Sequence, residues 1–268
     1  MNSLFHGAAA CILECDPAQK VRLTRETAGH WRNGVLSLLD DDAVAAIDEP
    51  GRPPRPMLVP PRELPKRGFN TVTGRAALVH AVAHIEFNAI NLAWDAVYRF
   101  RGMPPQFYGD WVRVAEEEAY HFTLLQKRLH GLGYDYGDFN AHNGLWEMAR
   151  DTAHDVLVRM ALVPRVLEAR GLDVTPGMMA RLGAAGDEET MALLGIILRD
   201  EIGHVEIGSR WFRWLCEGRG LTAEVVFREL IERHMKGRVK GPFYRTARLQ
   251  AGFSENELEA LEQMGQTA

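Results

Sequence analysis

Residues 74–101 read GRAALVHAVAHIEFNAINLAWDAVYRFR, and this stretch decides the fold class. Apolar residues recur around Glu86 at helical spacing, among them Val79, Ala83 and Ile90, which predicts one long helix with an apolar seam. The alanines in the seam would let a second helix approach closely. A carboxylate in such a seam costs several kcal/mol unless it is paired or binds a metal. Glu86 is therefore a candidate functional residue.

Similar helical patterns recur along the rest of the chain. We expect long helices at 109–130, at 145–170 and from Asp187 to about 217. Shorter helices are expected within 16–48, after Thr175-Pro176, at 222–235 and after Ser254. Ser254 and Glu257 form a capping box for the last of these. Pro164 should kink or break the third long helix. No segment alternates polar and apolar residues long enough to predict a strand. The sequence therefore predicts an all-α protein.

Residues 49–68 differ from everything around them, with seven prolines and five basic residues. Proline lacks an amide donor and disfavours helix in the residue before it, so this segment should be extended. It is either a strap that packs on the domain surface or a basic arm for an anionic partner. The net charge of −5 and a pI of about 6.1 favour the strap and give nucleic-acid binding little support.

Two segments contain Glu-x-x-His: Glu118 with His121, and Glu201 with His204. Residues i and i+3 share one face of a helix, so each pair can bind one metal ion. One such pair is expected by chance in a chain this rich in Glu and His, and ordinary surface capping or ion pairing would explain it. Both pairs, however, lie within apolar helical pattern, where a buried carboxylate needs a partner.

A lone glutamate precedes each pair at nearly the same distance. Glu86 lies 32 residues before Glu118, and Glu168 lies 33 residues before Glu201. The chain therefore predicts two helical hairpins, each with one Glu and one Glu-x-x-His, joined by a long crossover. That is the connectivity of a ferritin-like four-helix bundle. We expect the bundle at 74–218, with an N-terminal helical segment and the strap at 1–73 and a helical extension at 219–268.

Three other residues compete as ligands. His80 and His84 are four residues apart and could pair on a metal, but His84 points about 200° away from Glu86 at roughly 100° per residue. They are more simply explained as packing on the outer face or under the strap. Asp155 is the alternative to Glu168, because Pro164 disturbs the helix just before Glu168.

Five stretches resemble a known family: GRPPRP (51–56), VPPRELPKR (59–67), HAVAHIEFNAINLAWD (80–95), MALVPRVLEARGLDVTP (160–176) and ILRDEIGHVEIGSRWF (197–212). They resemble an uncharacterised bacterial family, a domain of unknown function, within the ferritin-like diiron-carboxylate superfamily. The resemblance covers nearly the whole chain. The sequence Glu168-Ala-Arg170 is also similar to one in the superfamily's tRNA-modifying diiron monooxygenase, a distant relative.

The resemblance implies a role for each candidate ligand. Glu118 or Glu201 would bridge two metals, Glu86 and Glu168 would bind terminally, and His121 and His204 would give one imidazole to each metal. Asp200 would hydrogen-bond His121 and fix its tautomer, and Glu117 would do the same for His204.

Carboxylate and imidazole ligands suit two Fe ions, or Mn or a mixed Fe/Mn pair, better than structural zinc. Open coordination positions favour an oxidoreductase that uses O2 or peroxide on a small-molecule or tRNA-borne substrate. The alternatives are metal or iron handling without turnover and a partner-binding protein that kept the fold. The chain has no CxxC pair for a rubredoxin-type domain, and Leu125 stands where the ribonucleotide-reductase small subunit keeps its radical tyrosine.

Localisation and assembly follow from the remaining features. The three cysteines, Cys11, Cys15 and Cys216, do not form a disulfide framework, and residues 1–12 lack the basic start of a signal peptide. No run reaches the roughly 18 apolar residues of a membrane helix. We therefore expect a cytoplasmic protein, a monomer or small homo-oligomer with no membrane partner.

Overall fold

The computed structural model describes residues 3–39, 42–64, 68–235 and 239–266, and every regular element in these ranges is a helix. The β pairing recorded there is limited to two isolated bridges, Ser3–Ser37 and Leu58–Ala141. The all-α prediction is therefore confirmed. The chain divides into two compact units, residues 1–150 and 151–268. This division falls between the two expected hairpins.

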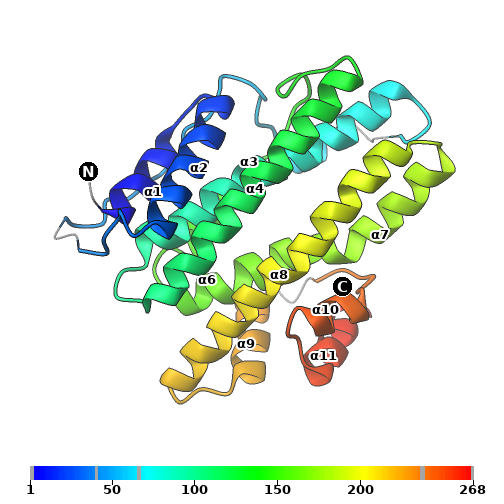
Figure 1. The fold of residues 1–268 in the computed structure, drawn as a ribbon. Helices are drawn as coiled ribbons and strands as arrows, with labels where there is room; N and C mark the ends of the chain where they lie inside the picture. The colour runs from blue at the N-terminus through cyan, green and yellow to red at the C-terminus, as the bar shows by residue number, and fades with distance from the viewer. Residues whose placement is uncertain (1–2, 40–41, 65–67, 236–238, 267–268) are drawn as a thin grey trace. The chain divides into compact units, whose positions relative to one another are not determined.

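The first unit is built on a hairpin of two long helices (Figure 1). Its elements are α1 (Leu4–Leu13), α2 (Pro17–Arg32), the 3₁₀ turn η1 (Pro61–Glu63), α3 (Val72–Arg99), α4 (Pro105–Gly131) and α5 (Gly144–Asp151). Helices α3 and α4 pack along their lengths, α1 packs on α3, and α2 packs on α4. The core of this unit therefore lies between α3, α4 and the two N-terminal helices.

Local signals explain where α3 and α4 begin and end. The Thr71 side chain accepts a hydrogen bond from Gly74 N and caps α3. Gly102 takes a φ of +77° in the turn that follows α3, and Pro105 opens α4 at a position where an amide donor is not needed. Helix α3 is long and apolar enough to span a membrane, but 89 % of its most apolar 18-residue stretch is buried inside the structure. Such burial is typical of a helix in a protein core.

The N-terminal region differs from the expectation. Helix α1 was not predicted, and α2 ends at Arg32, whereas we expected helix up to residue 48. Gly34 follows with a φ of +67°, a left-handed conformation that stops the helix. The buried Lys20 joins these helices, since its Nζ donates to Cys11 O, Ile12 O and Asn91 Oδ1 at 2.6–2.9 Å.

The proline-rich segment packs as a strap on its own unit. Val59 N donates to Ala141 O at 2.8 Å, and Ala141 N donates to Met57 O at 3.0 Å. Arg52 is held by Asn143 Oδ1 at 2.7 Å and by Glu49 at 2.9 Å. These contacts support the strap over a free basic arm for the part described here. Three of its residues, Pro65, Lys66 and Arg67, lie outside the described residues.

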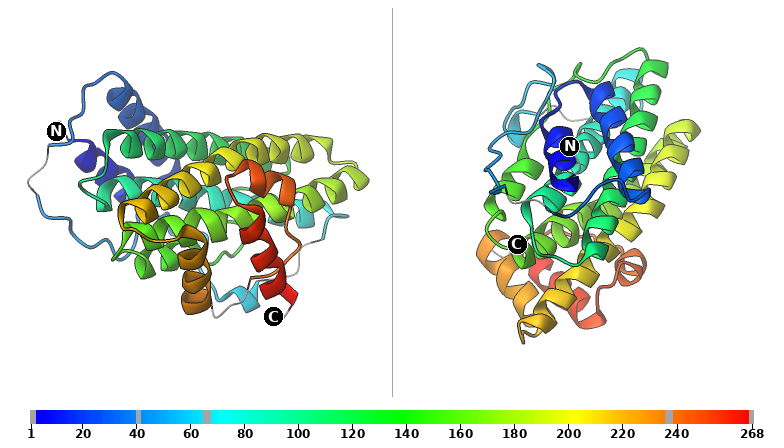
Figure 2. Two further views of the ribbon diagram at one scale, coloured as in Figure 1. Left: turned by 90° about the horizontal axis from the view of Figure 1, so that it is seen from below. Right: turned by 60° about the vertical axis from the view of Figure 1, so that its left-hand side comes forward.

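The second unit contains a second hairpin. Its elements are α6 (Val156–Leu162), the π-helix η2 (Val163–Glu168), α7 (Ala169–Ala184), α8 (Glu188–Gly218), α9 (Ala223–Met235), α10 (Arg245–Gln250) and α11 (Glu255–Gln266). Helices α7 and α8 pack on each other, with α6 and η2 also against α8. Helix α10 contacts α7 and α8, and α11 contacts α9; both are orange to red in Figure 2.

The third expected helix is the least accurate prediction. The chain breaks before Asp155, whose side chain caps α6 by accepting from Leu157 N at 2.8 Å. Pro164 falls in η2, where the wider π turn accommodates the missing donor. Thr175-Pro176 does not start a new helix, because α7 continues through Pro176 to Ala184.

Two other predicted helix signals in this unit are confirmed. Helix α8 begins after Asp187, whose side chain accepts from Thr190 N. Ser254 and Glu257 form the reciprocal capping box of α11, with bonds of 3.1 and 2.9 Å.

Candidate metal centre

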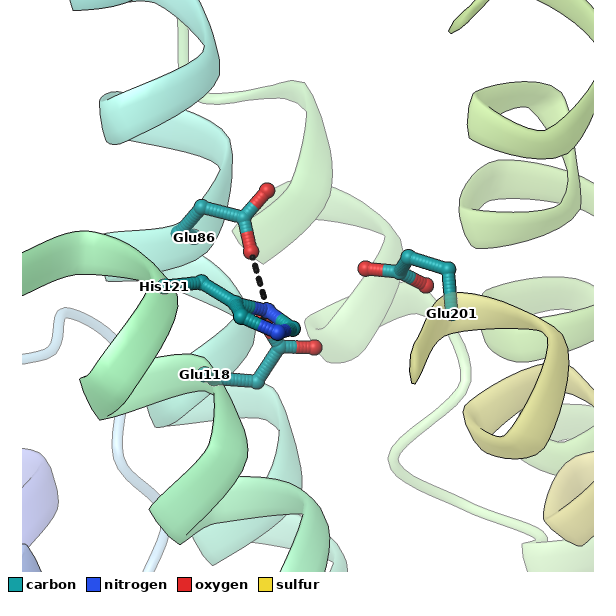
Figure 3. A group of neighbouring side chains, drawn as sticks. All are labelled: Glu86, Glu118, His121 and Glu201. Carbon is teal, nitrogen blue, oxygen red and sulfur yellow. Dashed lines mark hydrogen bonds and ion pairs between the residues drawn. The ribbon is translucent and has the colours of Figure 1, made fainter. Parts of the chain in front are cut away.

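Three predicted ligands meet inside the first unit. Glu86 comes from α3, and Glu118 and His121 lie one turn apart on α4. His121 Nδ1 lies 3.2 Å from Glu86 Oε2 and 3.4 Å from Glu118 Oε2 (Figure 3). The three ligand atoms all lie within 4.8 Å of one another, a group that could hold a metal ion. Glu201, also drawn in Figure 3, belongs to α8 in the other unit.

The group is buried, and its ionisable side chains are crowded. Glu86 is 2 % exposed, and Glu118 and His121 are completely buried. Burial and the neighbouring Glu118 carboxylate raise the pKa of Glu86 to about 8. Burial alone would lower the pKa of His121, but its hydrogen bonds to Glu118 and Glu86 outweigh that effect and raise it. Two carboxylates and an imidazole crowded in this way favour a bound cation.

The packing of α3 on α4 explains why the three side chains meet. Small residues, including Ala83, Ala115 and Ala119, are fully buried, which is consistent with close packing of the two helices. An aromatic cluster lies nearby, with the rings of Phe87 and Phe122 at 5.5 Å. Both rings are fully buried and follow Glu86 and His121 directly in sequence, so the group lies in a largely apolar region, where charge interactions are strong.

The second unit carries the other predicted ligands. Glu201 and His204 share one face of α8, with His204 Nδ1 3.8 Å from Glu201 Oε2. His204 is 1 % exposed and Glu201 9 %. Glu168 is the last residue of η2 and is partly buried. The predicted Glu-x-x-His is therefore inward-facing here as well, but its two side chains are further apart than a hydrogen bond.

A glycine on α8 makes room for the π-helix that carries Glu168. A Cβ at Gly208 would lie 2.3 Å from Pro164 Cγ and 2.4 Å from Pro164 Cβ, closer than real side chains approach. The backbone of η2 can therefore pack on α8 only because residue 208 has no side chain. The sequence did not predict this contact, because Pro164 and Gly208 are distant in sequence and neither has a side chain that could bind a metal or react.

The residues expected to support the ligands occupy partly buried positions. Asp200 lies on α8 beside Glu201, and its Oδ1 accepts from Arg199 Nε at 2.9 Å. Glu117 lies on α4 beside Glu118.

His80 and His84, the competing ligand candidates, bind the connection between α4 and α5. His84 Nδ1 lies 2.8 Å from Tyr136 Oη, and His84 Nε2 lies 3.1 Å from His142 O. His80 Nε2 accepts from Gly137 N at 2.9 Å. Burial lowers the pKa of His84 to about 3, so it is neutral near pH 7. These two histidines thus fix the connection between α4 and α5, which the strap also touches.

Asp155, the alternative to Glu168, has a structural role. Its carboxylate caps α6 and receives two hydrogen bonds from Arg219, at 2.7 and 2.8 Å. The bonds from Arg219 and from Leu157 N lower its pKa against the opposing effect of burial. Both oxygens are therefore used within the unit, and Glu168 remains the candidate.

Two comparisons with known proteins bear on this chain. The family model described as "Protein of unknown function (DUF455)" matches residues 13–259. An uncharacterised protein of Haemophilus influenzae (strain ATCC 51907 / DSM 11121 / KW20 / Rd) is 49 % identical over 282 residues, which cover 100 % of this chain and 96 % of that protein. No solved structure matches.

Proposed function

The chain belongs to the DUF455 family of proteins of unknown function, and from its candidate metal centre we propose that it is a di-metal carboxylate oxidoreductase. The observation that carries the proposal is the buried group of Glu86, Glu118 and His121, whose ligand atoms lie within 4.8 Å of one another. Buried acids this close are costly without a cation. An ordinary structural ion pair would not need a second carboxylate.

The donor set fits iron or manganese. It offers carboxylate oxygens and imidazole nitrogen, and the cysteines lie elsewhere, with Cys11 and Cys15 in the N-terminal helical region and Cys216 near the end of α8. Structural zinc sites are typically tetrahedral and rich in Cys. When bound, two such metals supply redox chemistry with O2 or peroxide at open coordination positions.

The protein's own residues would bind the metals and handle protons. His121 Nδ1 lies between two carboxylates at 3.2 and 3.4 Å, a position where it carries a proton in the metal-free protein. An imidazole ligand must be neutral, so that proton leaves when a metal binds. Metal affinity should therefore rise with pH, and binding should release protons.

We propose that Glu168, Glu201 and His204 complete the centre. The second unit repeats the first in its ligand order, with one Glu on an earlier helix and a Glu-x-x-His on the next. Glu168 ends a π-helix, an irregularity that is frequent at functional sites. This repetition is the reason to expect a ferritin-like four-helix bundle formed from the two hairpins.

The roles of two supporting residues come from the family resemblance alone. Asp200 would orient His121, and Glu117 would orient His204, each through the ring nitrogen that does not bind metal. The substrate would be a small molecule or tRNA-borne, and the protein would act in the cytoplasm as a monomer or small homo-oligomer.

Aerobic iron binding tests the proposed function. The metal-free full chain is mixed with excess ferrous iron, and both bound iron and O2 consumption are measured. The proposal predicts saturation near two irons per chain, with O2 consumed. Uptake of hundreds of irons per oligomer would indicate storage. Saturation near two without reaction with O2 or peroxide would leave metal handling without turnover, the alternative function.

A further inference from the structure

The second unit contains a cavity that the proposed metal centre does not use. Its volume is about 200 Å³, and it lies between η2, α7, the end of α9 and the segment that leads to α10. Its apolar wall comes from Val166, Leu167, Met235, Val239, Phe243 and Leu261. Glu168 follows Leu167 in the same π-helix but does not line the cavity. The space corresponds to roughly seven waters at about 30 Å³ each, enough for a short acyl chain.

Cations dominate the charged part of the wall. Among the described residues that line the cavity, four are cations, Arg165, Arg170, Lys240 and Arg248, and one is an acid, Asp173. Glu257 does not line the cavity but accepts a hydrogen bond from Arg165 at 2.7 Å. When Glu257 is included, these residues still carry two more positive than negative charges. An anion therefore suits the cavity better than a neutral or cationic ligand of the same shape.

The guanidinium groups of Arg165 and Arg248 each have one buried nitrogen without a hydrogen-bond acceptor. Arg165 is 1 % exposed and donates to Glu257 and Ser209, while Arg248 is 3 % exposed and donates to Asp173 at 2.7 and 2.9 Å. In both residues, Nη1 is buried and has no hydrogen-bond acceptor. A buried donor without an acceptor costs about 1–3 kcal/mol. Both side chains are thus incompletely satisfied within the protein.

Aromatic rings hold the two guanidinium groups in place. The Arg165 Cζ lies 4.1 Å from the ring centre of Phe227 and 4.5 Å from that of Phe253, and the Arg248 Cζ lies 4.9 Å from the same Phe253 ring. Rings stabilise the charge but do not replace an oxygen acceptor for the N–H. The arginines are therefore positioned before any ligand arrives.

We propose that this cavity binds a small amphipathic carboxylate, its oxygens on Arg165 and Arg248 and its acyl chain along Val166, Met235 and Leu261. A guanidinium fork matches a carboxylate in shape and charge. The apolar wall accounts for the chain, and the excess of cations accounts for the head group. The inference does not depend on metal binding, because no residue of the proposed centre lines the cavity.

Ligands that share a chain but differ in head group test the proposal without changing the buried arginines. The full chain is titrated with octanoate, octan-1-ol, octylamine and acetate, and binding is followed by calorimetry and by NMR of the methionine methyl groups. Octanoate should bind at least about tenfold more tightly than the other three, because only it has both the anionic head and the chain. Its binding should shift the Met235 signal.

Two variants locate the site. Met235→Trp should fill the cavity and weaken octanoate binding by about tenfold or more, and Lys240→Glu should weaken it by a few-fold. Met57→Trp and Lys127→Glu, exposed positions in the other unit, are the matched controls and should bind octanoate as the unaltered chain does. Equal binding of octanoate and octylamine, no measurable octanoate binding, or no effect of Met235→Trp would overturn the proposal.

Discussion

The two Glu-x-x-His segments have the same spacing but different surroundings. On α4, Glu118 and His121 are completely buried, and His121 also contacts Glu86 across the hairpin. On α8, Glu201 and His204 are 3.8 Å apart, and the upstream Glu168 ends a π-helix. The first set is held together by its own hydrogen bonds. In the second, Glu168 is positioned by the packing of η2 on α8.

This difference predicts unequal effects of removing each histidine. His121→Ala should lose metal from the full chain almost completely, because it removes the residue that links both carboxylates of the preorganised set. His204→Ala should lose about one metal per chain and keep the other. Elemental analysis of the purified variants measures both. Equal metal loss from the two variants would mean that the first set is not preorganised in the way described.

A substitution at the contact between η2 and α8 should have the next largest effect. Gly208→Ala places a Cβ against Pro164 and should lower the free energy of unfolding by about 1–3 kcal/mol, a typical cost of overpacking. Because η2 carries Glu168, metal binding should weaken too. Chemical denaturation and metal titration measure the two effects.

Gly177→Ala on the neighbouring helix is the control. Nothing lies within 4 Å of a Cβ at Gly177, so this change should be neutral or stabilise by up to about 1 kcal/mol. If Gly208→Ala behaves like Gly177→Ala, the close packing of η2 on α8 does not exist in solution.

The smallest effect concerns the histidine that holds the loop of the first unit. The pKa of His84 is about 3 in the folded protein, against 6.5 for the free side chain, because burial disfavours the charged ring. Between these values the unfolded chain binds more protons than the folded one, so stability falls as pH falls from about 6.5 towards 3. Unfolding by urea across this pH range should show that His84→Gln flattens the slope.

The exposed His154→Gln is the matched control for the pH experiment. It should keep the slope of the unaltered chain. If both variants reduce the pH dependence of stability equally, the effect is not specific to the buried His84. The contacts of His84 with Tyr136 and His142 would then contribute less to stability than their distances indicate.

The sequence predicted the fold class and the long helices because their signals are local. Apolar periodicity identified α3, α4 and α8, and capping side chains such as Asp187 and Ser254 marked helix starts that the structure confirms. The pairing of Glu86 with the Glu-x-x-His of α4 also followed from periodicity, since residues on an inward face of a hairpin must meet across it.

Other features depend on contacts that no local pattern contains. The segment 145–170 looks like one helix, yet Asp155 and Pro164 divide it. The π-helix η2 can pack on α8 only because Gly208 lies opposite Pro164. The roles of His80 and His84 depend on the path of the loop that contains Tyr136, which sequence spacing cannot predict. The surroundings of Arg165 and Arg248 likewise depend on residues distant in sequence, Glu257 of α11 and Asp173 of α7.

X-ray absorption spectroscopy of the iron-loaded full chain tests the central claim most directly, that ligands of the two hairpins bind a pair of metals together. We expect nitrogen and oxygen ligands around iron and a second iron at about 3.5–4 Å, the separation of metals in two-metal sites. Glu201→Gln should weaken or abolish that iron–iron signal. Bound iron without a neighbouring iron, or a signal that Glu201→Gln leaves unchanged, would contradict the account.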